Sequence, residues 1–322
     1  MTEFELIERY FRRPARNAVL GVGDDAALIA PSPGFEIAAT VDMLLEGRHF
    51  FAGAEAEALG HKTLAVNLSD LAAMGAMPRW ALLALALPSV DEGWLAAFAR
   101  GFFALADAHG VDLVGGDTTR GPRNLCVTVL GEVPAGKALR RSGAKGGDSI
   151  WVSGTLGDAA LAIAHRLGRI RLEGADLADC ERTLARPAPR VALGLALRGI
   201  ASAVIDVSDG LVGDLGHVLD ASRIGATIDI DALPRSSAMA AQLAGAQRDV
   251  ALQCLLAGGD DYELCFTAPR SRDAAIAALG ARLGLPLTRI GIATAQHRGL
   301  EVRDASGASL EPLPRAFDHF AS

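Results

Sequence analysis

The sequence lacks the features that mark membrane and nucleic-acid-binding proteins. Its 322 residues contain no apolar run of about eighteen, the length that a membrane-spanning helix needs. The formal net charge is −7, and no basic tract is long enough to follow a nucleic acid backbone. We therefore expect a soluble globular protein with neither a membrane nor a nucleic acid as partner.

Cysteines, export signals and familiar catalytic motifs are also scarce. The four cysteines are far apart, without CxxC spacing, which favours reduced thiols over a disulfide frame or a zinc site. The N-terminus carries acidic residues where a signal peptide would carry bases, so we expect a cytoplasmic protein. The chain contains no nucleophile elbow and no HRD or DFG set of a protein kinase.

The length and the pattern of apolar residues predict an α+β protein with two domains. A polar stretch rich in Gly, Lys and Arg at 140–148 suggests a boundary, with domains 1–139 and 140–322. Apolar periodicity predicts helices and strands in both halves. The expected helices are 2–12, 63–75, 91–109, 159–167, 176–186 and 191–199, and the clearest strands are 36–42, 80–88, 125–133, 149–154 and 203–207.

The helix expected at 63–75 carries an unusual polar stripe. Its apolar residues surround most of the helix, which predicts burial, yet Thr63, Asn67 and Asp70 recur at i, i+4 and i+7 on one face. A buried carboxylate is costly unless a cation or hydrogen-bond donors meet it. Asp70 is therefore either a hydrogen-bonded structural residue or a metal ligand.

Other aspartates stand at turns and strand ends, where working residues gather. Each alone fits a surface turn, and Ser208 or Asp209 fits a cap of the following helix. Together they favour hard ions that bind oxygen, above all Mg²⁺. His49 is equally consistent with a structural or a ligand-binding role, and Arg141 with a linker charge or a phosphate clamp. The acidic positions are Asp25, Asp42, Asp117, Asp206, Asp209, Asp260 and Asp261.

Several Mg²⁺ ions held by carboxylates point to phosphoryl transfer. If the acceptor is itself a phosphate, no catalytic base is needed, because a phosphate monoester has its second pKa near ~6. Catalysis then consists of neutralising charge and aligning two phosphates in line.

The motifs in this order resemble those of the thiamine-monophosphate kinase family, in the superfamily that includes aminoimidazole ribonucleotide synthetase, selenophosphate synthetase and the hydrogenase-maturation dehydratase. Any one motif is weak, but together they are specific. The matching segments are Gly23-Asp24-Asp25-Ala26, residues 42–50, residues 67–76, residues 115–119, residues 141–144, residues 206–211, residues 258–262 and the tail.

The resemblance implies ATP-dependent phosphorylation of thiamine phosphate to thiamine diphosphate. It implies a homodimer formed through the N-terminal sheet domains, a C-terminal α/β domain, and an ATP site between the domains of one chain. Asp25, Asp42, Asp70 and Asp117 would be catalytic. The implied Mg²⁺ ligands are Asp25, Thr40, Val41, Asp42, Asp70, Asp117, Asp206 and Asp209; the ATP contacts are Gly116, Asp117, Arg141 and Ser208; and the substrate contacts are His49, Asp260 and Phe317.

Two positions depart from the family pattern. Val41 stands where a hydroxyl residue is common, so any ligation there must use its backbone carbonyl. Phe317 replaces the usual Trp or Tyr, which keeps ring stacking on a cationic thiazolium but loses a polar group.

Two other functions remain as alternatives. One is a related ATP-dependent synthetase or cyclo-ligase of the same superfamily, acting on an amide; the tail aromatic and the Gly-Gly-Asp-Asp-Tyr turn argue against it. Selenophosphate synthetase is disfavoured because no Cys lies near the N-terminal glycine turn. The other is a non-catalytic nucleotide-binding protein, which an acid at every implied metal position disfavours.

Overall fold

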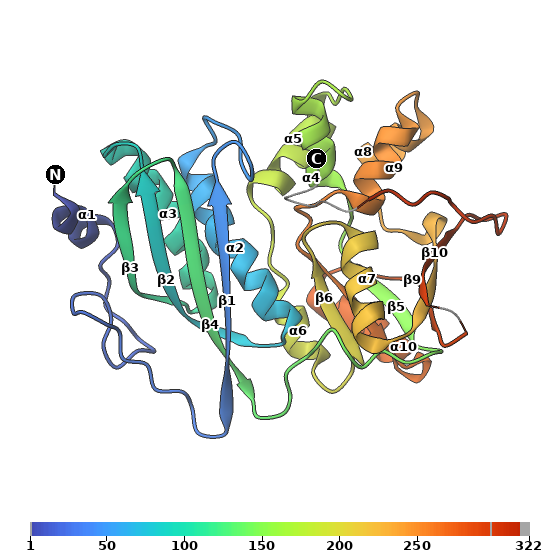
Figure 1. The fold of residues 1–322 in the computed structure, drawn as a ribbon, viewed down its shortest axis with the longest axis horizontal. Helices are drawn as coiled ribbons and strands as arrows, with labels where there is room; N and C mark the ends of the chain where they lie inside the picture. The colour runs from blue at the N-terminus through green and yellow to red at the C-terminus, as the bar shows by residue number, and fades with distance from the viewer. Residues whose placement is uncertain (1, 297, 316–322) are drawn as a thin grey trace. The chain divides into compact units, whose positions relative to one another are not determined.

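The computed structural model of the chain describes residues 2–296 and 298–315. The chain folds into two compact units (Figure 1). Unit 1 comprises the residues up to Leu71 together with Ala76–Ala138, and unit 2 comprises Ala72–Gly75 together with the chain from Leu139 onward. Each unit contains one sheet and several helices, which confirms the predicted α+β class.

Unit 1 is a four-stranded sheet in the order β1-β4-β2-β3. Its elements are α1 (Glu3–Tyr10), β1 (Phe35–Leu45), α2 (Ala56–Ala73), β2 (Met77–Leu87), α3 (Glu92–His109), β3 (Asp112–Arg120) and β4 (Asn124–Pro134). Strand β4 pairs antiparallel with β1 and β2, and β2 pairs in parallel with β3 through the crossover helix α3. Strand β2, helix α3 and strand β3 thus form a β-α-β unit.

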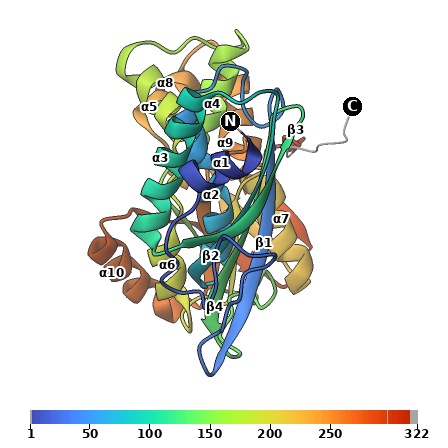
Figure 2. The same cartoon turned by 90° about the vertical axis from the view of Figure 1, so that its left-hand side faces the viewer.

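Helices α2 and α3 pack closely together beside the sheet (Figure 2). A Cβ atom added to Gly60 would lie 2.0 Å from the Phe98 carbonyl oxygen, and one added to Gly101 would lie 1.8 Å from that of Glu57. The two backbones therefore touch at positions where only glycine fits. Phe98 and Phe102 are fully buried in this unit.

Alternate residues of β1 leave an apolar surface uncovered in the described chain. Side chains on a strand point to opposite faces in turn, so every second residue of β1 shares this face. The large exposed members are Phe35, Ile37, Val41, Met43 and Leu45, each between 37% and 59% exposed. We call these five residues the β1 surface.

Unit 2 is a six-stranded sheet in the order β10-β7-β9-β5-β8-β6. Strands β10 and β7 pair in parallel, and the other neighbours pair antiparallel. Its elements are β5 (Ser149–Ser153), α4 (Asp158–Arg166), α5 (Gly174–Ala185), α6 (Val191–Leu197), β6 (Ala203–Val207), α7 (Leu211–Ser222), β7 (Gly225–Asp229), α8 (Ser237–Ala244), α9 (Arg248–Ala257), β8 (Glu263–Ala268), α10 (Asp273–Leu283), β9 (Leu287–Thr294) and β10 (Gly299–Arg303), with short 3-10 helices at Ile230–Ala232 and Arg270–Arg272.

The core of unit 2 is formed by apolar side chains from its sheet and helices, including Ile150, Leu156 and Leu215, all fully buried. Cys180 and Cys254 belong to this core, and burial raises the pKa of their thiols to about 12 and about 11. All four cysteines are unpaired, which confirms the expectation of free thiols. Among the described residues, the helices are too short or too polar to cross a membrane.

Candidate functional site

Strand β1 and helix α2 bring predicted site residues together in unit 1. Thr40 and Asp42 are two positions apart on β1, so their side chains lie on the same face of the strand. The Thr40 hydroxyl donates a hydrogen bond to Oδ2 of Asp70 on α2. The backbone N–H of Asp42 donates to Oδ1 of Asn67, on the same helix, at 3.0 Å. The polar stripe of α2 therefore contacts the strand that carries Asp42.

The two other members of the stripe also form hydrogen bonds within their own helix. The Thr63 hydroxyl donates to the Leu59 carbonyl at 2.7 Å, and Nδ2 of Asn67 donates to the Thr63 carbonyl at 3.2 Å. Both side chains are buried, whereas Asp70 is half-buried. A structural role thus accounts for Thr63 and Asn67, while Asp70 is the member of the stripe that reaches towards solvent.

The surroundings of Asp42 differ from the sequence-based expectation. Strand β1 continues to Leu45, so Asp42 lies inside the strand, and the prediction that a loop begins there is wrong. The cause is pairing along the whole length of β4, which extends the strand beyond its most apolar part. Val41 is 59% exposed on the opposite face, so only its backbone can take part on the side of Thr40 and Asp70.

A cavity of about 1060 Å³ in unit 1 includes Asp25 and Asp117 in its lining. Residues of β2, β3 and β4 line it, together with α1 and the loop that carries Asp25. Cys126 also lines this cavity, and the pKa of its thiol is raised by burial and then by the charge of Asp42. The structure thus brings Asp25 and Asp117 to one cavity, with the charge of Asp42 acting on the same region.

Asp117 lies in a strand, not in the glycine-rich loop that the sequence suggested. Strand β3 continues through Gly115 and Gly116 to Arg120, in parallel register with β2. A Cβ atom on Gly116 would lie 1.8 Å from the Leu83 carbonyl oxygen of β2. Glycine at this position therefore permits close strand pairing and leaves the backbone next to Asp117 bare.

His49 is held in one orientation by the turn that follows β1. The backbone N–H of Leu45 donates to Nδ1 of His49 at 3.0 Å, and the backbone N–H of His49 donates to the Leu45 carbonyl at 2.9 Å. Because Nδ1 accepts a hydrogen bond, the neutral imidazole carries its proton on Nε2. The turn therefore presents a ring that can donate from Nε2.

The acidic turn at 206–210 in unit 2 is held by a residue that sequence reasoning missed. The N–H groups of Ser208 and Asp209 both donate to Oδ2 of Asp214, each at 3.0 Å. Gly210 occupies the N-cap of α7 with no side-chain cap, so the prediction that Ser208 or Asp209 caps this helix is wrong. The carboxylate of Asp214, in the first turn of the helix, binds the preceding turn instead.

Burial raises the pKa of Asp214 to about 7; the charge of Asp209 adds to this, while hydrogen bonds from the turn and the charge of Arg141 oppose it. The positive charge of Arg141 therefore acts on the carboxylate that binds the Ser208–Asp209 turn. Asp206 is the second-to-last residue of β6, just before this turn, and is 4% exposed. In the sequence, the only sign of this role of Asp214 was its position as an acidic residue in the first turn of the helix that follows the acidic turn.

The glycine-rich turn at 258–262 lies against the same acidic turn. The Asp260 N–H donates to the Ser208 carbonyl at 2.8 Å, and the Tyr262 N–H donates to the Val207 carbonyl at 2.8 Å. The structure therefore places Asp260 next to Ser208 and Asp209. The order of the motifs in the sequence could not show this contact.

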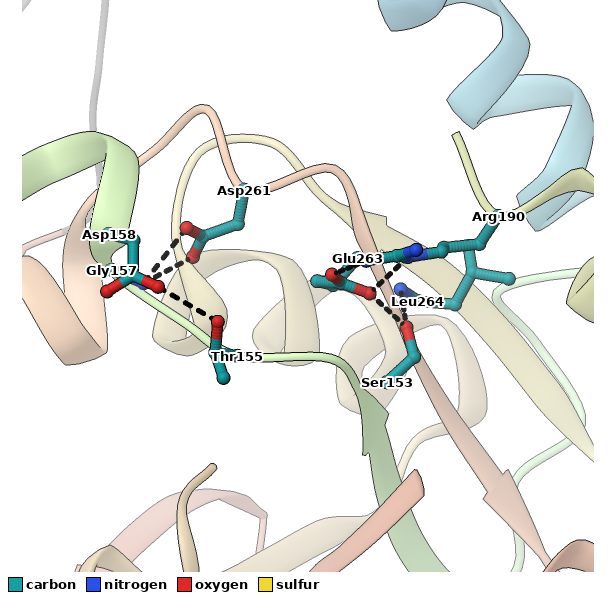
Figure 3. Close-up of polar contacts among 8 residues, drawn as sticks. All are labelled: Ser153, Thr155, Gly157, Asp158, Arg190, Asp261, Glu263 and Leu264. Carbon is teal, nitrogen blue, oxygen red and sulfur yellow. Dashed lines mark hydrogen bonds and ion pairs between the residues drawn. The ribbon is translucent and has the colours of Figure 1, made fainter. Parts of the chain in front are cut away.

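Two further carboxylates from this segment enter the interior of unit 2 (Figure 3). Both oxygens of Asp261 lie 2.9 Å from the backbone nitrogen of Gly157, just before α4, and burial raises the Asp261 pKa well above its ordinary value. Glu263 accepts hydrogen bonds from Ser153 and from two nitrogens of Arg190. These contacts attach the turn to strand β5 and to the start of α4.

The oxygen atoms of the predicted site residues are of the kind that a hard cation binds, but they do not form a complete metal-binding site. They are carboxylate and hydroxyl oxygens, which Mg²⁺ prefers. Within the residues that the structure describes, no three His, Cys, Asp or Glu side chains gather closely enough to hold an ion. Mg²⁺ is commonly bound by one or two carboxylates together with substrate phosphates, and acids at Asp42 and Asp70 suit that mode.

The predicted site residues thus form groups within each unit. Unit 1 holds Thr40, Asp42 and Asp70 beside one another, and Asp25, Gly116 and Asp117 around the cavity. Unit 2 holds Asp206 in β6 and Ser208, Asp209 and Asp260 in the adjoining turns, and the charge of Arg141 acts on Asp214 beside them. Phe317 lies outside the described residues.

Two family models match the chain, one to each half. The model described as AIR synthase related protein, N-terminal domain, matches residues 23–133. The model described as AIR synthase related protein, C-terminal domain, matches residues 145–303. Together they cover well over half of the chain.

Relatives match along almost the full length. Thiamine-monophosphate kinase of Salmonella typhimurium is 46% identical over 325 residues, covering 99% of this chain and 98% of the relative. That of Bacillus subtilis is 32% identical, covering 99% and 100%. The crystal structure of thiamine-monophosphate kinase from Stenotrophomonas maltophilia is 49% identical, with a TM-score of 0.86 and coverage of 96% and 98%. AaThiL, solved in complex with AMPPCP and TMP, is 29% identical, with a TM-score of 0.78 and coverage of 90% and 89%.

Proposed function

The chain belongs to the thiamine-monophosphate kinase family of the AIR synthase related proteins, and from this we propose that it transfers the γ-phosphoryl group of ATP to thiamine phosphate. The observation that carries the proposal is near-complete coverage by thiamine-monophosphate kinases at up to 49% identity. The complex of AaThiL with AMPPCP and TMP supports ATP and thiamine phosphate as the two substrates.

The chemistry needs little from the protein beyond charge and alignment. The acceptor phosphate has its second pKa near ~6, so at neutral pH its oxygen is already ionised and no side chain has to remove a proton. The residues of this chain then have to bind both substrates, hold their phosphates in line and exclude water.

The unit 1 carboxylates Asp25, Asp42, Asp70 and Asp117 are the proposed catalytic residues. They would hold Mg²⁺ with the Thr40 hydroxyl and the Val41 carbonyl, and Asp206 and Asp209 would do so in unit 2. When bound, Mg²⁺ would neutralise charge on the transferred phosphoryl group. The hydrogen bond from Thr40 to Asp70 supports this assignment because it orients the Asp70 carboxylate. The carboxylate is still the group that would supply oxygen ligands to the metal ion.

The remaining predicted residues are proposed to bind the two substrates. Gly116 would offer the phosphates of ATP a backbone without a side chain, and Ser208 would offer a hydroxyl group. Arg141 would offer a guanidinium group that can form two hydrogen bonds to a phosphate. On the acceptor side, the Nε2 proton of His49 suits a phosphate oxygen, and Asp260 suits the cationic part of thiamine phosphate. Phe317 is proposed to stack on the thiazolium ring.

We further propose that the protein is a homodimer joined through the β1 surface. An uncovered apolar face of this kind marks an interaction site, since monomers rarely expose large contiguous apolar patches. The residues of this surface alternate along a single strand, so a second copy of the sheet would bury them together.

The decisive assay measures thiamine diphosphate formed from thiamine phosphate, ATP and Mg²⁺, with free thiamine as the comparison. We expect ready turnover of thiamine phosphate and poor turnover of thiamine, because a neutral hydroxyl would need a base. Comparable rates with the two acceptors would overturn the proposed chemistry. ATP turnover that depends on an amide substrate instead would favour a related synthetase.

A further inference from the structure

Two residues of the Gly258–Tyr262 turn have a backbone conformation that non-glycine residues seldom adopt. Asp260 has φ of 70° and Tyr262 has φ of 52°. Positive φ is uncommon for Asp and is a true outlier for a bulky side chain such as Tyr. Such conformations persist where the surrounding structure fixes them, and they concentrate at functional sites.

The turn is fixed from two directions. On one side, the backbone N–H groups of Asp260 and Tyr262 bind the carbonyls of Ser208 and Val207. A Cβ atom on Gly259 would lie 2.5 Å from the Ser208 carbonyl oxygen, so the two turns are in close contact. The central residue, Asp261, is buried and attached to the backbone nitrogen before α4.

This arrangement brings the side chains of the two strained residues together. The Tyr262 hydroxyl donates a hydrogen bond to Oδ1 of Asp260 at 3.0 Å. The Tyr262 side chain is almost completely buried, at 9% exposure, whereas Asp260 is half-buried. The ring is thus a buried support with one polar atom, and that atom binds the half-buried carboxylate of Asp260.

We propose that Tyr262 is a positioning residue that orients Asp260 for the thiamine phosphate acceptor. The inference rests on the proposed function, because it takes Asp260 as an acceptor contact. A carboxylate that can rotate would bind the acceptor in several poses, whereas one fixed by a buried hydroxyl is ready for a single pose. The adjoining contact with Ser208 keeps this pose in register with the nucleotide side of unit 2.

The test is Tyr262→Phe, which keeps the ring and removes only the hydroxyl. Loss of a hydrogen bond to a charged group predicts a roughly tenfold higher KM for thiamine phosphate, with the KM for ATP unchanged and only a small fall in melting temperature. The matched control is Tyr10→Phe on α1, the only other tyrosine in the sequence, which should change neither KM. Direct titration of the protein with thiamine phosphate should show the same loss of affinity.

A double-mutant cycle with Asp260→Asn separates positioning from general disruption. If Tyr262 acts through Asp260, adding Tyr262→Phe to Asp260→Asn should cause little further loss. Additive losses or equal effects on both KM values would overturn the inference while leaving the proposed function intact. Wild-type protein that forms no thiamine diphosphate would overturn the proposed function and, with it, this role of Tyr262.

Discussion

Arg190→Met should destabilise unit 2 strongly, because it leaves the buried carboxylate of Glu263 without its cation. Nε of Arg190 lies 2.7 Å from Oε2 of Glu263, and a second guanidinium nitrogen binds Oε1 (Figure 3). The Glu263 side chain is 6% exposed, and a Cβ atom on Gly154 would lie 2.0 Å from its Oε1. The structure therefore leaves this carboxylate little room to turn towards water.

The magnitude follows from burial. Breaking a buried ion pair by removing one partner costs about 3–5 kcal/mol. The Arg190 side chain is 24% exposed, so water already screens part of the interaction, and we expect the lower end, about 3 kcal/mol. For a unit of this size that corresponds to a melting temperature lower by roughly 6–12 °C.

The assay is thermal unfolding of purified protein, with urea unfolding as a second measure. The matched control is Arg171→Met, which breaks an ion pair with Glu173 at 2.6 Å whose side chains are 85% and 69% exposed. Exposed pairs contribute little, so the control should melt close to wild type. Adding Glu263→Gln to Arg190→Met should recover part of the loss, since no buried charge remains. An Arg190→Met protein that melts with the control would refute the reasoning.

Three further predictions concern the proposed site, the pH dependence and the assembly. Asp70→Asn should reduce thiamine diphosphate formation by about 100-fold or more without lowering the melting temperature in chelator, since Asn can still accept from Thr40; a destabilised but active protein would contradict this. Burial raises the pKa of Asp158, so its contribution to stability is full below about pH 4 and is lost as pH rises through the raised value. As the pH rises through the raised pKa of Asp158, the melting temperature of the wild type should therefore fall relative to that of Asp158→Asn. Melting temperatures of the two proteins that change in parallel with pH would exclude the effect. Ile37→Glu on the β1 surface should halve the mass measured by light scattering, whereas Ile292→Glu, at a residue of similar exposure in unit 2, should not; a wild-type monomer would refute the dimer.

Local sequence patterns determined most of the elements. The apolar periodicity at 91–109 predicted α3, and the continuous apolar run at 80–88 predicted the interior strand β2. Such patterns predict secondary structure because the spacing of apolar residues directly reflects the period of a helix or strand that packs on one side. The turns at 206–210 and 258–262 could be predicted for a similar reason, since glycine and aspartate favour tight turns.

Tertiary structure decided where strands ended and which carboxylates were held by which partners. Glycines around Asp117 suggested a loop, but pairing with β2 carries the strand through them, because Gly116 permits the backbones to approach closely. Ser208 and Asp209 suggested caps, yet Asp214 binds their N–H groups from the following helix.

No local sequence pattern could predict how the Gly258–Tyr262 turn is attached to the rest of unit 2. The contact of Asp261 with Gly157 joins residues 104 positions apart, and Asp260 meets Ser208 because β8 and β6 are neighbours in the sheet. By itself the sequence determined which residue types could bind phosphates and cations. Folding decided which of them meet, because hydrogen bonds between distant segments and the exclusion of water depend on the whole packed unit and not on neighbouring residues.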